Sequence, residues 1–137
     1  MIFCDTSFAA KLYAQEPESA AVSALLNTED KIFVSELFRV ELMAVFHRRL
    51  REGLWARQQF ATAIAQFQRD DINGLWAWLP INHELVMKAT QRFITLPKTT
   101  FLRAADCLHL ATALHHGFDE IHTFDLHQAK VAQEFGL

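Results

Sequence analysis

Residues 1–10 read MIFCDTSFAA, and their order of apolar and polar side chains decides how the rest of the chain is interpreted. Residues 2–4 predict a short buried strand, and Asp5 follows directly at its end. Asp, Thr and Ser are favoured helix N-caps because their side chains accept backbone N–H groups that lack an intrahelical partner. Asp5 is therefore either a helix cap or a site carboxylate, and these ten residues leave both interpretations open.

Strands and helices alternate along the whole chain. The strand candidates are residues 2–4, 32–34, 78–81 and 120–123. Helical patterns cover residues 8–15, 20–26, 36–52, 56–69, 83–96, 102–116 and 128–135. This alternation predicts right-handed crossovers and a parallel sheet with helices on both faces. We expect an α/β fold in a single domain that spans residues 1–137.

The composition narrows the class of protein. Of the 137 residues, 51% are hydrophobic, with four Gly and three Pro, which favours long helices over a turn-rich all-β fold. A net charge of −3 argues against coating nucleic acid through bulk positive charge, although bound cations reverse the sign of an acidic site. Cys4 and Cys107, without a signal peptide or a long apolar run, predict reduced thiols in a cytoplasmic protein with no membrane span.

Two carboxylates follow predicted strands. Asp5 follows the first strand and Asp125 follows the fourth. Sites in parallel α/β folds form beyond the carboxyl ends of the strands, so we expect both acids at the same edge of the sheet. Thr123, two residues before Asp125, has a hydroxyl that could orient a carboxylate or a metal-bound water.

Glu41 lies on an otherwise apolar face of the helix predicted for residues 36–52. Its neighbours three and four residues away are apolar, namely Leu37, Phe38, Ala44 and Val45. No local ion pair explains the position. Because a lone buried charge is costly, Glu41 should face water, a partner from elsewhere in the fold, or a metal ion.

Asp106 repeats this pattern in the helix predicted for residues 102–116. It shares a face with Leu102, Leu110 and Ala113. Arg103 and His109, three residues to either side, are alternative partners, and an acid early in a helix also suits the helix dipole. Alone, Asp106 is either an ion-pair residue or a ligand.

The four acids together favour a metal site. Several carboxylates supply the all-oxygen ligation that suits Mg²⁺ or Mn²⁺ rather than zinc. Clustered acids repel one another unless a cation lies among them, and such cations activate water for phosphodiester hydrolysis. The seven histidines include no HExxH motif, and we interpret them as solvated or core residues. His109 is the exception, because it could contact a ligating carboxylate or a phosphate.

Four stretches carry a family resemblance: FCDTSFAAKLY, VSELFRVEL, LRAADCLHLATAL and IHTFDLHQAKVAQEFGL. In this order and spacing they resemble PIN domains, and more closely the VapC-type toxins of toxin–antitoxin operons. The resemblance implies a three-layer α/β/α sandwich with a four-stranded parallel sheet, a fifth edge strand being doubtful here. It also implies an Mg²⁺-dependent endoribonuclease, a homodimer and a cognate antitoxin that blocks the site. The corresponding residues are Asp5, Glu41, Asp106 and Asp125, with Thr123 as the hydroxyl before the last acid.

Two interpretations remain beside this one. A non-catalytic PIN-like module that binds RNA or protein is the alternative function, although such a module is expected to lack one or more of the acids. The basic stretch FHRRLREGLWAR predicts either a solvated helix end or an RNA-binding rim. The residues of that rim would be Arg48, Arg49 and Arg51, with Arg103 and His109 from the later helix.

Overall fold

Three parallel strands form the central sheet of the computed structural model, which describes all residues 1–137. They are β1 (Ile2–Phe3), β2 (Ile32–Ser35) and β3 (Trp76–Leu79), paired in the order β1-β2-β3. The register places Ile32 between Ile2 on one side and Trp76 on the other. Apolar, β-branched and aromatic residues favour buried parallel strands of this kind. The predicted α/β class is confirmed.

The fourth expected strand, residues 120–123, is reduced to one isolated parallel bridge between Cys4 and His122. The N–H of His122 donates to the carbonyl of Phe3 at 2.9 Å, and the N–H of Asp5 donates to the carbonyl of His122 at 3.1 Å. Strand pairing stops there because the backbone N–H of Asp125 donates a hydrogen bond to the Thr123 hydroxyl, at 3.0 Å, and the chain turns. The expected count of four or five strands is therefore corrected to three strands and a single bridge.

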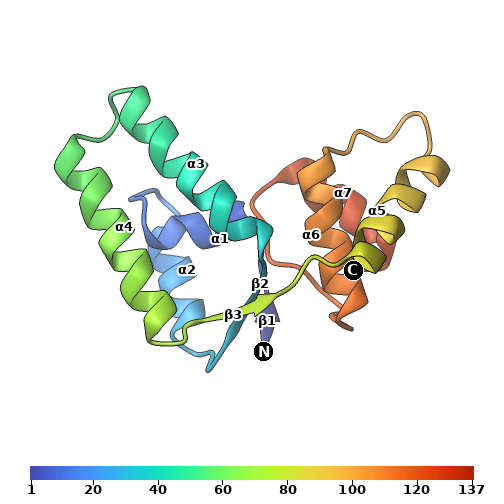
Figure 1. Ribbon diagram of the computed structural model, residues 1–137, viewed down its shortest axis with the longest axis horizontal. Helices are drawn as coiled ribbons and strands as arrows, with labels where there is room; N and C mark the ends of the chain where they lie inside the picture. The colour runs from blue at the N-terminus through green and yellow to red at the C-terminus, as the bar shows by residue number, and fades with distance from the viewer.

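Helices cover both faces of the sheet, as the three-layer prediction requires (Figure 1). One layer contains α1 (Thr6–Ala9), the 3-10 helix η1 (Ala10–Leu12), α2 (Ser19–Leu26), α3 (Leu37–Arg51) and α4 (Arg57–Ile72). The opposite layer contains α5 (His83–Thr95), α6 (Ala104–His115) and α7 (Leu126–Phe135). None of these helices has the length and apolar character needed to cross a membrane.

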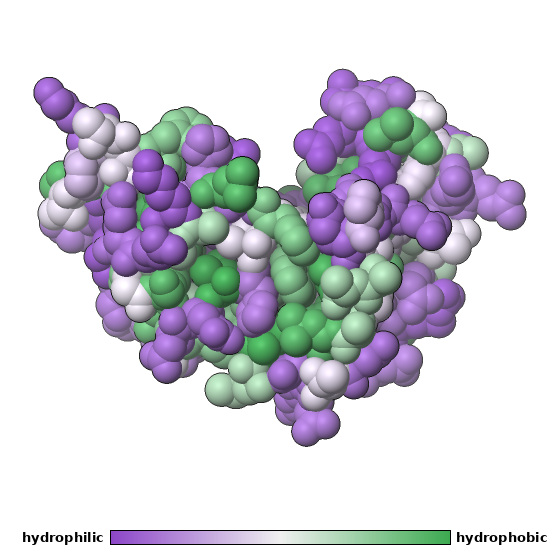
Figure 2. Space-filling model, turned by 180° about the vertical axis from the view of Figure 1, so that it is seen from behind, coloured by the Kyte–Doolittle hydropathy of each residue, from purple (hydrophilic) through white to green (hydrophobic).

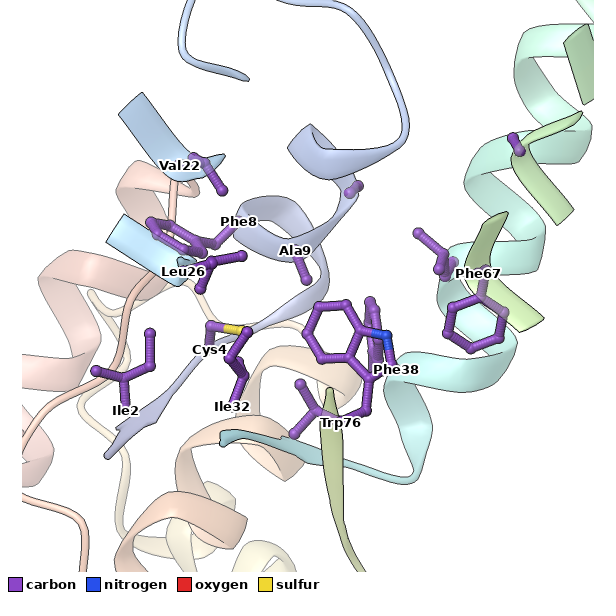
Figure 3. Close-up of a cluster of buried hydrophobic side chains, with 14 of the residues drawn as sticks. Ile2, Cys4, Phe8, Ala9, Val22, Leu26, Ile32, Phe38, Phe67 and Trp76 are labelled. Carbon is purple, nitrogen blue, oxygen red and sulfur yellow. The ribbon is translucent and has the colours of Figure 1, made fainter. Parts of the chain in front are cut away.

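The core consists of two clusters, one on each side of the sheet. Strand residues such as Ile2, Cys4 and Ile32 belong to one buried cluster with Phe38 of α3 and Phe67 of α4 (Figure 3). The second cluster joins α5, α6 and α7 through buried residues that include Leu85, Leu110 and Val131. Since α3 and α6 belong to different layers and meet beside the sheet, the space between them is lined by both halves of the chain.

Several elements begin one or two residues earlier than the sequence predicts, and two of them show the cause. The helix expected over residues 8–15 starts at Thr6 and is short, because the Asp5 carboxylate caps it and η1 follows at once. Strand β3 starts at Trp76 rather than at Trp78. Gly74, with φ of +77°, turns the chain directly after α4, and only glycine adopts this conformation without strain. Both differences arise from local caps and turns.

Candidate functional site

Asp5 is the most enclosed of the predicted site acids. Its side chain accepts the backbone N–H of Phe8 at 3.0 Å, so it caps α1, and the Ser7 hydroxyl donates to it at 2.8 Å. The Thr123 hydroxyl donates to the other carboxylate oxygen at 2.6 Å. Asp5 is 3% exposed, and this burial raises its pKa although the hydrogen bonds oppose the effect. Asp5 caps a helix and also lines a cleft that contains the other three acids.

Hydroxyl groups join the two ends of the chain at this point. Thr123 lies within 3.1 Å of Ser7, and the Ser7 hydroxyl accepts the backbone N–H of Phe124 at 2.8 Å. Thr123 therefore orients Asp5 and, through the N–H of Asp125, also fixes the start of α7. Sequence reasoning treated Ser7 only as a possible cap. Its position two residues after Asp5, on the first turn of a helix, was the signal for a role at the site.

Glu41 finds its partner on another helix. Oε2 of Glu41 lies 2.6 Å from Nε2 of His109, and the Thr6 hydroxyl donates to the same oxygen. None of the hydrogen bonds in the structure reaches Oε1, which leaves that oxygen available to a ligand. Burial alone would raise the pKa of Glu41, but the hydrogen bond and charge of His109 outweigh it and lower the pKa.

His109 is buried, with 1% of its surface exposed. Because an ionised carboxylate can only accept a hydrogen bond, the Nε2–H group of His109 is the donor to Glu41. The buried Nδ1 of His109 has no hydrogen-bond partner. Of the two roles expected from the sequence, contact with a carboxylate is the one that the structure displays. His109 also lines the cleft that contains the acids.

Asp106 and Asp125 share one cation. Nε of Arg103 donates to Asp106 at 2.7 Å, and Nη2 of Arg103 pairs with Asp125. Asp125 also caps α7 by accepting the N–H groups of His127 and Gln128, at 2.9 and 3.0 Å. Burial opposes ionisation of Asp125, but these N–H groups and Arg103 lower its pKa overall.

All four acids line one open cleft of about 630 Å³. It lies between α3 and the start of α6, and Figure 2 shows the surface hollowed between two lobes. Arg48, Arg51 and Arg103 also line it. Arg49 does not, because it pairs with Glu16 and lies over the Trp55 ring. The basic rim therefore contains part of the predicted set.

The acids share the cleft without converging on a single point. As placed, no three acidic, histidine or cysteine side chains lie close enough together to hold one metal ion. Three of the four carboxylates instead contact Arg103 or His109. The donors nevertheless fit a hard divalent cation, because the cleft offers carboxylate and hydroxyl oxygens and both thiols are buried elsewhere.

Comparison with known proteins adds a family and a fold. A family model described as PIN domain matches residues 2–134, whereas no curated protein sequence matches significantly. The structure of VapC20 from Mycobacterium tuberculosis, described as a sarcin-ricin loop cleaving toxin, is similar with a TM-score of 0.75. It is 16% identical, and the match covers 96% of this chain and 95% of that chain. FitAcB from Neisseria gonorrhoeae has a TM-score of 0.69 at 20% identity, covering 97% and 94%.

Proposed function

This chain belongs to the PIN domain family, and from that premise we propose that it is a metal-dependent endoribonuclease. The observation that carries the proposal is the cleft lined by four carboxylates from separate parts of the fold. Asp5 follows β1, Glu41 lies on α3, Asp106 on α6 and Asp125 at the start of α7. These four carboxylates together supply the all-oxygen ligands that a divalent cation prefers.

The proposed cofactor is Mg²⁺, with Mn²⁺ as a substitute. Asp5, Asp106 and Asp125 would hold the ion directly, and Glu41 would either ligate it or position the attacking water. When bound, such an ion activates water and stabilises the charge that develops on a phosphodiester. Thr123 and Ser7 hold Asp5 in place for this purpose, while Thr6 and His109 leave one oxygen of Glu41 open.

The proposed substrate is RNA. Arg48 and Arg51 line the same cleft as the acids, and cations beside an acidic site can bind the phosphates on either side of the cleaved bond. Neither guanidinium pairs with a site carboxylate, so both are available to a substrate. We therefore assign phosphate binding to Arg48 and Arg51, in a protein that acts in the cytoplasm.

The proposed biological role is that of a toxin paired with an antitoxin. The resemblance to VapC-type toxins implies both this partner and a homodimer. A second cleft, of about 610 Å³, lies between η1 and α4 and is lined in part by Leu12, Tyr13 and Trp55. This mixed lining of apolar side chains and uncharged polar ones such as Gln59 suits an amphipathic helix of the antitoxin. An arginine from the same partner would pair with the acids and exclude metal.

Cleavage of labelled single-stranded RNA tests the proposed chemistry. Asp106→Asn keeps the shape of the side chain and removes a proposed ligand, so we expect a loss of about 100-fold or more in Mg²⁺ or Mn²⁺. Asp119→Asn is the matched control, because Asp119 is exposed and has no ion-pair partner. Full activity of Asp106→Asn would overturn the mechanism. RNA binding without cleavage by the unmodified protein would favour the non-catalytic module instead.

A further inference from the structure

Arg103 covers two of the carboxylate oxygens that a metal ion could use. Its guanidinium contacts Oδ2 of Asp106 and Oδ2 of Asp125. Oδ1 of Asp125 is already engaged by the two N–H groups that it caps, which leaves Oδ2 as the oxygen most available to a ligand. Asp106 has no side-chain hydrogen bond other than the one from Arg103. One side chain thus occupies one oxygen of each acid, and Oδ1 of Asp106 stays free.

Arg103 is also the most exposed partner in this arrangement. Its side chain is 55% exposed, whereas the Asp106 and Asp125 side chains are 11% and 20% exposed. It precedes α6 as the N-cap residue, outside the helix itself, and no aromatic ring lies over its guanidinium. The guanidinium can therefore move into solvent at a modest cost in free energy, while α6 and the N-cap of α7 hold the two carboxylates in place.

We propose that Arg103 is an internal counter-cation, which holds Asp106 and Asp125 together in the metal-free protein and is displaced when the divalent ion binds. The inference rests on the metal site proposed above. It implies that the measured metal affinity is reduced by competition, because an existing pair of charge-assisted hydrogen bonds must be broken first. Arg103 then sets the metal concentration at which the site becomes occupied.

Calorimetric titration of the whole protein with Mn²⁺ tests this competition. Arg103→Gln should bind Mn²⁺ about tenfold more tightly than the unmodified protein, because hydrogen bonds to charged groups are no longer lost on binding. Arg48→Gln is the matched control. It removes the same charge from the same cleft without touching a carboxylate, so its affinity should change much less. Without metal, Arg103→Gln should also melt at a lower temperature than Arg48→Gln.

The outcomes separate the inference from the proposed function. If Arg103→Gln binds Mn²⁺ no more tightly than Arg48→Gln, or more weakly, Arg103 is a structural clamp and the inference is overturned while the metal site stands. If none of the proteins binds Mn²⁺, the metal site itself is overturned. Arg103→Lys provides a second test if the glutamine variant does not fold. A lysine cannot bridge both acids with a planar fork, so its affinity should lie between the other two.

Discussion

Nε2 of His109 on α6 lies 2.6 Å from Oε2 of Glu41 on α3, so a buried imidazole links the two helices that border the acidic cleft. The Thr6 hydroxyl donates to the same oxygen of Glu41. Two donors on one oxygen fix the carboxylate while its other oxygen stays open. This arrangement is typical of groups that orient a ligand without touching the substrate.

Removing either donor should weaken the site without abolishing the fold. We expect Thr6→Val, which keeps the shape of the side chain, to lower Mn²⁺ affinity and RNA cleavage by roughly 10-fold. A double variant that also carries His109→Ala should lose more than either single variant. Titration and cleavage assays, with circular dichroism to confirm folding, measure the effect. Unchanged affinity in the double variant would show that Glu41 needs no positioning.

Metal should stabilise the folded protein. At a tenfold excess over its Kd, an ion that binds only the folded state adds about 1.4 kcal/mol, or roughly 3–6 °C in melting temperature for a domain of this size. Thermal melts with and without millimolar Mg²⁺ give this shift. Asp106→Asn should abolish it, and Asp119→Asn should keep it. An equal shift in both variants would place the stabilising ion outside the cleft.

Tyr13 should make stability depend on alkaline pH. Its hydroxyl donates to Asp70 at 2.8 Å and accepts from the Trp76 indole at 3.1 Å. Burial, followed by the contact with Asp70, raises the pKa of Tyr13. Because the folded pKa exceeds the unfolded value of about 10, this contribution is complete below pH 10 and is lost as the pH rises above it.

Tyr13→Phe isolates that contribution. At pH 7 the variant should unfold more easily by about 1 kcal/mol, because the Trp76 donor and the Asp70 acceptor lose their partner. Above pH 10 the difference should shrink, since unfolding of the unmodified protein becomes easier as its tyrosine ionises. Urea titrations at the two pH values measure both differences. A difference that grows with pH would contradict the predicted sign.

Expression of this chain alone should arrest the growth of its host, and co-expression of its antitoxin should restore growth. Asp5→Asn should be harmless alone and still bind the antitoxin, because the cleft between η1 and α4 shares no lining residue with the acidic cleft. Growth curves and co-purification provide the measurements. If the unmodified chain is harmless although folded protein is recovered, the toxin role is excluded and the nuclease chemistry remains to be judged by the RNA assay.

Sequence reasoning succeeded where a feature depends on the order of elements. Asp5 and the segment containing Asp125 were expected at one edge of a parallel sheet, and both line the same cleft. The pairing of Arg103 with Asp106 was likewise one of two alternatives, since three residues separate them on a helix. These features follow from the helical repeat and from the order of strands and helices, both of which can be read from a sequence.

Features that depend on how helices from different layers meet were not predicted in full. Glu41 was expected to need a partner and His109 was expected to contact a carboxylate or a phosphate, yet nothing in the sequence matched the two residues, because packing of α3 against α6 sets that distance. The reach of Arg103 to Asp125 depends in the same way on where α7 begins. The fourth strand failed for a local reason, because the Thr123 hydroxyl captures an N–H group and turns the chain.

The single bridge between Cys4 and His122 has a consequence for the synthesis of this protein. It connects the first strand to a segment more than a hundred residues later, so the loop that it closes contains most of the chain. Contacts of such long separation form late in folding. A ribosome must therefore translate nearly the whole message before Asp125 can reach Asp5. We expect nascent or prematurely terminated chains to lack the proposed nuclease activity.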